Sequence, residues 1–474
     1  MSTSDRRIAG PALARLVGRV PTGVPAYLGL SDAVTRAVTD GALPVGTRVP
    51  SERELAGALG LSRTTISAAY QQLRERGLLR TRQGSGSVTT LPDAGPGATL
   101  LPSDDAGPVD LATAAPAAPP ALVGAARRAM DRLPHHIGGG GYAQLGLPEL
   151  RAHLADRYTA RGIPTTADQI LVTSGAQGAT SLLAAALVGP GDRVAVENPA
   201  YPHTLAAIRA AGARPVPVPV HHAGLDLELL EATVRRAAPG LVHITPDHHN
   251  PTGTSLDPEA RERLRRIATR HRTPVIGDET LSDLTLEGPP LEPFLGRDPD
   301  EHLVAVGSAS KSFWGGLRLG WIRAHRDLIL RLGQARVHRD LGAPVLDQLV
   351  LVELLADADA LLAERRAELR TRRDALVEAI ERALPWQVAV PAGGLSVWVD
   401  LGAPLSSALA AVAPRHGVRV TPGSAFGVDG GFETRLRLPF AAPAEHLVRG
   451  VTALASAWAT LGPRAAAQTE TIPV

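Results

Sequence analysis

The chain has 474 residues, of which 44% are hydrophobic and 20% are charged, and its formal net charge is +2. This length predicts two or more domains, and the composition is typical of a globular protein and excludes a disordered or membrane-embedded chain. Because no stretch approaches the ~18 uninterrupted apolar residues of a membrane span and the first ten residues lack the apolar run of a secretory signal, we expect a cytoplasmic protein with no membrane partner.

The chain contains no cysteine and one lysine, Lys311. The lack of cysteine excludes disulfides, thiolate zinc sites and cysteine nucleophiles. Arginine replaces lysine at most surface sites, but it cannot attack a carbonyl group as a neutral amine, because guanidinium stays protonated. A single lysine therefore invites interpretation as a Schiff-base residue, although genome base composition alone could explain the excess of arginine.

Basic residues are concentrated at the N-terminal end of the chain. Residues 1–90 contain 12 arginines against six acidic residues, a net charge of +6, and the remainder carries a net charge of −4. We therefore expect the N-terminal end to bind a polyanion.

Two helices joined by a tight turn are predicted after Pro50. Ser51 and Glu54 form a capping box, in which Ser51 accepts from the Glu54 amide and the Glu54 carboxylate reaches back. Gly60 permits the turn and Ser62 caps the second helix. The apolar stripe of this second helix consists of Ile66, Ala69, Tyr70 and Leu73.

The opposite face of the second helix is polar and has the character of a recognition surface. Its first turn is where such a helix meets base edges and phosphates, and the face consists of Arg63, Thr64, Thr65, Ser67 and Gln71. Two short strands on either side of Gly84 predict a wing, since glycines allow close approach to a backbone. A helix-turn-helix used only for packing is the alternative, which the basic excess and the wing disfavour.

The segment from about Leu28 to Thr90 resembles the GntR family of winged-helix repressors. By this resemblance the residues that touch DNA are Arg53, Arg63, Thr64, Thr65 and Gly84. The predicted DNA-binding set further includes Ser62, Ser67 and Arg82. Some family members carry a base-reading arginine at the position of Ser67, so the base preference stays open.

Residues 91–108 are rich in Pro, Gly and Asp without apolar periodicity, which predicts a flexible linker between a DNA-binding domain at 20–90 and a second domain at 109–474. The second domain alternates apolar strands with helices, as α/β domains do. The tail after residue 462 has little to bury and is expected to be mobile. Ligands of such domains gather after the strands, which we expect at 193–197, 241–245, 274–278 and 303–307.

Lys311 follows the last of these strands and stands between serines and Arg318. A loop amine beside hydroxyls and an arginine suits an aldehyde cofactor that carries a phosphate, and pyridoxal phosphate is that cofactor. Such a lysine needs an acid for the pyridinium nitrogen, a flat side chain over the ring, a donor to the 3′ oxygen and an anion cup. The candidates, in order along the chain, are Ser174-Gly175-Ala176-Gln177 for the cup, Tyr201 for the ring face, Asn250 for the 3′ oxygen and Asp278 for the nitrogen.

Each candidate has an ordinary alternative when it is taken alone. Asp278 could be a turn residue at a strand end, Tyr201 a core tyrosine, and Asn250 part of a simple turn. A glycine-containing helix start is weak evidence by itself. Their order and joint presence support the prediction.

These motifs resemble class I aminotransferases of fold type I over residues 109–462. The resemblance implies that Tyr142 reaches the phosphate of a neighbouring subunit in a homodimer, and that Arg437 grips a substrate carboxylate in a bidentate pair. An exposed strand arginine alternating with Arg435 is the alternative for Arg437. The resemblance assigns the phosphate to Gly175, Ala176, Gln177, Ser308 and Arg318, and the cofactor-binding set also includes Ser310.

One position departs from the family pattern. Two residues after Asp278, where a tyrosine usually donates to the 3′ oxygen, the chain has Thr280. The shorter side chain is expected to slow external aldimine chemistry while cofactor binding survives. No metal site is predicted, because the adjacent histidines lack ligand spacing and are expected in solvent; these pairs are His135-His136, His221-His222 and His248-His249.

A GntR-type reader fused to an aminotransferase-like domain resembles the MocR family. The resemblance implies a transcription regulator in which Lys311 holds pyridoxal phosphate as an internal aldimine. An amino compound, or the cofactor itself, would then shift a homodimer between two geometries on a double-stranded DNA operator. One alternative is a catalytically active class I aminotransferase with an accessory DNA-binding domain, favoured by Asn250, Asp278 and Arg437 and disfavoured by Thr280. Another is a winged helix joined to a degenerate domain that binds no cofactor.

Overall fold

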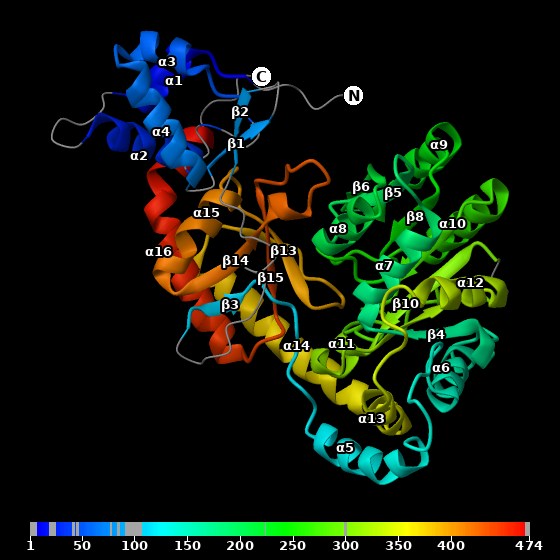
Figure 1. The fold of residues 1–474 in the computed structure, drawn as a ribbon. Coiled ribbons are helices and arrows are strands. Elements are labelled where there is room, and N and C mark those ends of the chain that lie inside the picture. Colours follow the sequence, from blue (N-terminus) through cyan, green and yellow to red (C-terminus); the bar gives the residue numbers. More distant parts are fainter. Residues whose placement is uncertain are drawn as a thin grey trace.

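A computed structural model describes most of the chain: residues 7–18, 25–39, 43, 47–75, 78–82, 86–90, 107–222, 224–297 and 301–469. Within these ranges the strands form sheets of two, eight and five strands (Figure 1). No helix in the described ranges is long and apolar enough to cross a membrane. Gly84 and most of the predicted linker lie outside the described residues.

The N-terminal domain is a winged helix-turn-helix. It consists of α1 (Gly10–Val17), α2 (Ala26–Thr39), α3 (Glu52–Leu59) and α4 (Arg63–Glu75), followed by the antiparallel pair β1 (Leu79–Arg82) and β2 (Gly86–Thr89). The predicted helix-turn-helix and wing are confirmed. The stripe predicted on α4 is buried in the domain core, with exposures of 0 to 3%, at Ile66, Ala69, Tyr70 and Leu73.

Glu54 acts differently from the sequence prediction. Ser51 accepts a hydrogen bond from the Glu54 amide at 3.2 Å, as expected for a capping box. The Glu54 carboxylate, however, accepts from the amide of Gly10 at 2.7 Å, at the first turn of α1. The reciprocal half of the box is therefore replaced, because an amide at the start of α1 offers the carboxylate an unpaired donor. Glu54 thus joins α1 to α3.

The eight-stranded sheet forms the centre of the second domain. Its strands, in spatial order, are β4 (Ile170–Thr173), β11 (Gly320–Arg323), β10 (Leu303–Ser308), β9 (Val275–Asp278), β8 (Leu241–Ile244), β5 (Arg193–Asn198), β6 (Arg214–His221) and β7 (Gly224–Leu225). The run from β10 to β6 is parallel, and β11 is antiparallel to β10. The four predicted strands are confirmed, and their carboxyl ends meet at one edge of the sheet.

Helices cover both faces of this sheet, which explains why its strands read as continuous apolar runs. One face packs on α5 (Ala121–Arg132), α6 (Pro148–Ala160), α9 (Leu227–Ala237), α10 (Pro258–His271) and α13 (Val345–Ala356). The other face packs on α7 (Gly175–Leu187), α8 (Pro202–Ala210) and α12 (Arg326–Arg336). Short 3-10 turns connect these elements at η1 (Leu133–His135), η2 (Ala167–Gln169) and η3 (Gly315–Leu317).

The five-stranded sheet lies between the N-terminal domain and the larger sheet (Figure 1). Its order is β12 (Gln387–Val388), β13 (Ser396–Asp400), β15 (Arg435–Pro439), β14 (Val418–Pro422) and β3 (Val109–Leu111). One face packs on α14 (Ala358–Ala383), α15 (Ser406–Val412) and α16 (Ala444–Thr469), with η4 (Ala413–His416) and η5 (Gly423–Phe426) between strands. Because strand residues alternate, Leu436 and Leu438 enter this core while Arg437 points to the other face.

The C-terminal tail differs from the prediction. Helix α16 continues to Thr469, so the backbone of residues 463–469 is helical where we expected a mobile segment. Alanine, arginine and glutamine, which have high helix propensity, make up most of this stretch. Residues 470–474 lie outside the described ranges.

Candidate cofactor site and DNA-reading surface

Lys311 lies in a one-turn helix, α11 (Ala309–Ser312), directly after β10. The prediction of a loop was wrong, because the Ser308 hydroxyl accepts from the Ser310 amide at 3.1 Å and so caps a helical turn. The Lys311 side chain is half-buried. Its Nζ donates to the carbonyl oxygen of Ala114 at 2.6 Å.

The charges around Lys311 favour a neutral amine. Burial lowers the pKa of Lys311 to about 8, the positive charges of Arg437 and Arg318 lower it further, and Asp278 opposes them. These groups come from three separate elements and act on one amine. A lysine with such a pKa has a substantial neutral fraction close to neutral pH, which is the form that attacks a carbonyl group.

Asp278 ends β9, which pairs with β10, the strand that leads to Lys311. One of its carboxylate oxygens accepts from the Thr280 amide at 2.9 Å, which closes a tight turn. His243, on the neighbouring β8, is buried, and burial lowers its pKa while the charges of Asp278 and Glu197 oppose the shift. Sequence analysis missed His243, whose signal was a single polar residue within an apolar strand.

Buried polar atoms near Asp278 lack a hydrogen-bond partner within the described part of the chain. They include Nε2 of His243 and Oγ1 of Thr280. Orphaned buried groups of this kind are rare in folded proteins and commonly mark a place where a bound molecule completes the hydrogen bonds.

The predicted anion cup lies at the start of α7. Gly175, with φ +77°, begins the helix, and the guanidinium of Arg318 stands 3.4 Å from where a Cβ on Gly175 would lie. A Cβ on Gly320 would stand 2.6 Å from the Ala176 amide nitrogen, so this strand can approach only as glycine. The side chain of Gln177 is engaged, since it donates to the His203 carbonyl at 3.1 Å. Free amides and one guanidinium therefore converge on this point.

Tyr201 lies near the charged residues that surround Lys311. It caps α8, and its ring meets His203 edge-on at 5.1 Å between centroids. Burial raises the pKa of Tyr201, and the charges of Arg437 and Arg318 act against that rise. The ring thus lies within electrostatic reach of the groups around Lys311.

Arg437 is buried on β15, with 6% of its surface exposed, so the alternative of an exposed strand arginine is wrong. Its guanidinium donates to the Ala112 carbonyl, lies 3.5 Å from the side-chain oxygen of Asn250, and stands 5.1 Å from the Phe426 ring centroid. Burial lowers the pKa of Arg437 to about 10. Its Nε has no partner among the described residues. A buried cation with a free donor suits a carboxylate ligand.

Tyr142 is the one predicted cofactor residue that stands apart from this group. Its side chain is 77% exposed, in the glycine-rich segment that follows η1. Such a position is open to a second subunit.

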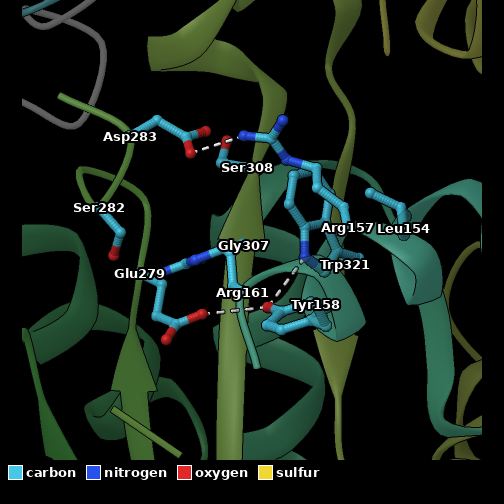
Figure 2. Close-up of a pocket in the computed structure, with 10 residues that line it drawn as sticks. All are labelled: Leu154, Arg157, Tyr158, Arg161, Glu279, Ser282, Asp283, Gly307, Ser308 and Trp321. Carbon is cyan, nitrogen blue, oxygen red and sulfur yellow. Dashed lines mark hydrogen bonds and ion pairs between the residues drawn. The ribbon is translucent and has the colours of Figure 1, made fainter. Parts of the chain in front are cut away.

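A polar pocket lined by α6, by the segment after β9 and by the ends of β10 and β11 was not predicted from the sequence (Figure 2). The Tyr158 hydroxyl donates to Glu279 at 3.1 Å and accepts from the Trp321 indole at 3.2 Å, and Arg157 pairs with Asp283 at 2.6 Å. These bonds join α6 to the segment after β9. Because the five residues come from three distant segments of the sequence, no local pattern could have brought them together.

The histidine pairs differ from one another. His135, His136, His221 and His222 are exposed or near the surface, but His248 and His249 are each 2% exposed, which corrects the expectation of solvent positions. Burial is possible because the ring of His248 bonds to Thr285 at 2.9 Å and that of His249 to Thr252 at 2.8 Å. The described residues contain no cluster of three or more metal-binding side chains.

The predicted DNA-reading residues cluster at the start of α4. Ser62 accepts from the Thr65 amide at 3.1 Å and lies 2.8 Å from the Thr64 hydroxyl, so it caps the helix as expected. Arg53, Ser62, Arg63 and Thr64 are exposed, and Thr65 and Ser67 are half-buried. Arg82 lies on β1 of the wing. The exposed hydroxyls and guanidinium groups are of the types that contact phosphates and bases.

The wing is fastened to the helices by the segment before α3. The Val49 amide donates to the Ser87 carbonyl at 3.0 Å, and the Thr89 amide donates to the Thr47 carbonyl at 2.9 Å. The Arg48 side chain lies 3.0 Å from where a Cβ on Gly86 would be. The wing is therefore hydrogen-bonded to the segment that leads into α3.

Comparison with protein families matches both parts of the chain. Residues 119–454 match the family described as aminotransferase class I and II. Residues 26–88 match the family of bacterial regulatory proteins, gntR family.

The chain is similar to two regulators and to one aminotransferase of known structure. The HTH-type transcriptional regulator TauR of Rhodobacter capsulatus is 31% identical, over 84% of this chain and 88% of its own. The probable rhizopine catabolism regulatory protein MocR of Rhizobium meliloti is 30% identical, over 63% of this chain and 65% of its own. Among solved structures, the alpha-aminoadipate aminotransferase LysN of Thermus thermophilus, complexed with N-(5'-phosphopyridoxyl)-L-leucine, has a TM-score of 0.69 and 28% identity, covering 77% of this chain and 97% of its own.

Proposed function

Since the chain belongs to the MocR family, in which a GntR-type DNA-binding domain is fused to a class I and II aminotransferase domain, we propose that it regulates transcription through pyridoxal phosphate held at Lys311. It is a transcription regulator of the GntR type. The proposal adds that the aminotransferase-like domain senses an amino compound, or the cofactor itself, and changes the grip of the DNA-binding domain on a double-stranded operator.

The residues present fit pyridoxal phosphate. The site offers a lysine with a lowered pKa, a carboxylate at a strand end, and a helix start with an arginine above it. The unpartnered atoms of His243 and Thr280 leave room for further hydrogen bonds. In a related aminotransferase, LysN, a phosphopyridoxyl compound is bound.

Each residue of the site has a proposed role. The phosphate would bind at Gly175, Ala176, Gln177, Ser308, Ser310 and Arg318, with Tyr142 of a second subunit. Asp278 would hold a proton on the ring nitrogen, Tyr201 would cover the ring, and Asn250 would donate to the 3′ oxygen. When bound, the cofactor supplies an electrophilic aldehyde and an electron-withdrawing ring.

The protein's own side chains decide what happens next. Lys311 must be neutral to bond to the aldehyde carbon, and burial together with the nearby cations keeps its pKa low. Arg437 would bind the carboxylate of an amino compound. Thr280 is too short to reach where the usual tyrosine hydroxyl stands, so the site is better equipped to bind than to turn over.

A working aminotransferase is the second candidate, favoured by Asp278 and Arg437, whose charges both act on Lys311. Steady turnover of an amino donor with a 2-oxo acid at about 1 per second or faster would support it. Turnover well below that rate would leave regulation as the function.

We further propose that the protein acts as a homodimer. Large apolar side chains are exposed along α5 and the segment after it, at Val123 (61%), Met130 (52%), Ile137 (69%) and Tyr142 (77%). Exposed apolar residues grouped in this way are typical of protein contact surfaces. A second copy here would bring Tyr142 to the neighbouring cofactor site.

The single lysine supplies a sharp test of cofactor binding. With added pyridoxal phosphate, the parent protein is expected to gain a visible absorption band that Lys311→Ala lacks. After reduction with borohydride, peptide mass analysis should place one phosphopyridoxyl group on Lys311, because the chain has no other lysine. Absence of the band with excess cofactor would leave the large domain as a cofactor-free sensor or scaffold.

A further inference from the structure

The segment between β3 and α5 crosses the site at the two cations that a ligand needs. The Ala114 carbonyl accepts from Lys311 Nζ at 2.6 Å, and the Ala112 carbonyl accepts from the Arg437 guanidinium. We name residues 112–114 the strap. Its carbonyl oxygens therefore bind the side chains of Lys311 and Arg437. The proposed function assigns the cofactor aldehyde to Lys311 and the effector carboxylate to Arg437.

Asp110 anchors the strap to the five-stranded sheet. One carboxylate oxygen accepts from the amides of Ala112 at 2.9 Å and Thr113 at 3.3 Å, and the other pairs with Arg419 on β14 at 3.0 Å. Burial would raise the pKa of Asp110, but the bonds from Thr113, Ala112 and Arg419 outweigh it, so the pKa lies below its ordinary value. The anchor is thus charged and stable.

The strap lies directly between the site and the part of the chain that leads to the DNA-binding domain. Upstream, β3 pairs with β14 immediately after the predicted linker. Downstream, the Ala117 carbonyl accepts from Arg365 at 2.6 Å, and the same guanidinium binds the Phe313 carbonyl at 3.1 Å. Because the downstream end of the strap is fixed to α14, we expect a movement of the strap to be passed to β3.

The chemistry favours displacement of the strap by ligands. A hydrogen bond from guanidinium to a carboxylate is roughly twice as strong as one to a neutral carbonyl. Arg437 is buried, and its Nε has no partner among the described residues. A carboxylate bound there would interact with the positive charge of the guanidinium and accept a second hydrogen bond, from Nε. A bond from Lys311 to the cofactor likewise removes its hydrogen bond to Ala114.

We propose that the strap competes with cofactor and effector for Lys311 and Arg437, that Asp110 is the positioning residue that holds it there, and that its release carries the state of the site to the linker. This inference rests on the proposed function. It identifies a physical connection between ligand binding and DNA binding.

Hydrogen exchange tests the release of the strap directly. Acetate is the probe for Arg437 and acetamide, its neutral isostere, is the control. Acetate should speed exchange at the Ala112 and Thr113 amides of the full-length protein several-fold, while acetamide leaves it unchanged. Pyridoxal phosphate should do the same through Lys311. Equal exchange rates at these amides with and without acetate would contradict the proposed release of the strap.

Variants of Asp110 separate positioning from stability. Asp110→Ala removes the acceptor of the Ala112 and Thr113 amides, so capture of pyridoxal phosphate should be about fivefold faster for each hydrogen bond lost. Asp110→Asn keeps an acceptor oxygen and should behave nearly as the parent. A merely structural role for Asp110 predicts slower capture in Asp110→Ala, which would contradict the proposal.

The tests distinguish failure of the strap from failure of the proposed function. Suppose that Lys311 takes up pyridoxal phosphate and operator affinity responds. If acetate then leaves hydrogen exchange of the strap unchanged, and Asp110→Ala captures the cofactor at the rate of the parent, the strap proposal is wrong and the proposed function stands. If Lys311 takes up no cofactor in any variant, the function fails. The acetate experiment depends on Arg437 alone and still decides on the strap in that case.

Discussion

At the scale of single residues, the low pKa of Lys311 depends on a cation from another strand. Burial is the first cause, and Arg437 on β15 is the second. The residue assigned to the effector carboxylate therefore also adjusts the amine assigned to the cofactor. Effector binding, by neutralising Arg437, is expected to raise the pKa of Lys311.

This coupling predicts a pH dependence of cofactor capture. The neutral amine is the reactive form, so the rate at which pyridoxal phosphate binds should rise with pH and level off above about 8. Arg437→Leu removes a positive charge and should move the midpoint to higher pH. Stopped-flow absorbance between pH 6 and 10 measures this.

Arg435→Gln is the matched control for that experiment. Arg435 lies on the same strand but pairs with Asp400 at 2.9 Å, outside the charges that act on Lys311. Its midpoint should stay where the parent has it. A midpoint unmoved in Arg437→Leu would refute the electrostatic coupling.

Residue identities were the part of the site most open to prediction. Lys311 and Asp278 stand out because their chemical types follow apolar strands, and Arg437 was assigned from the resemblance to class I aminotransferases. His243 and Glu279 were missed, since their roles arise from burial beside distant residues. The strap was missed as well, because its bonds are made by backbone carbonyls, which leave no mark in a sequence.

At the scale of elements, one contact fixes β10 and hence the position of Lys311. Trp321 on β11 lies against Gly307, where an added Cβ would stand 2.1 Å from the indole ring. The indole also donates to Tyr158 in the pocket behind the site (Figure 2). The strand therefore requires glycine at this position.

Gly307→Ala should disturb both stability and cofactor binding. The added methyl forces the indole or β10 to move, at a cost of about 1–3 kcal/mol in the free energy of unfolding. Gly315→Ala is the control, since a methyl there meets no atom within 4 Å. Urea unfolding and absorbance titration measure the two effects. Equal stability of the two variants would contradict this packing.

The elements themselves were well predicted where local pattern was strong. The buried parallel strands read as apolar runs, and the helix-turn-helix reads from its caps and stripe. Helix α11 was missed because a four-residue helix has almost no periodicity. The role of Glu54 differed because its partner, Gly10, lies 44 residues away.

At the scale of the whole molecule, the DNA-binding domain and the five-stranded sheet lie side by side, with α2 against α15 (Figure 1). β3, which leads into the strap, belongs to the sheet on which α15 packs. This contact offers the proposed release of the strap a short path to the DNA-binding domain.

The DNA-reading surface should respond to loss of one cation. Arg63→Ala is expected to weaken binding to a mixed-sequence duplex and to reduce the slope of log affinity against log salt by about 1, as for one lost phosphate contact. Arg263→Ala, on α10 and paired with Glu231, is the control. Fluorescence anisotropy across a salt series measures the slope, and an unchanged slope in Arg63→Ala would remove it from the interface.

The measurement that tests the central claim most directly is operator affinity with and without pyridoxal phosphate, in the parent and in Lys311→Ala. The duplex is one selected by the parent protein from a random pool in the presence of cofactor. We predict that pyridoxal phosphate changes the affinity of the parent several-fold and leaves that of Lys311→Ala unchanged. Equal affinities in all four conditions would contradict a regulator controlled through Lys311.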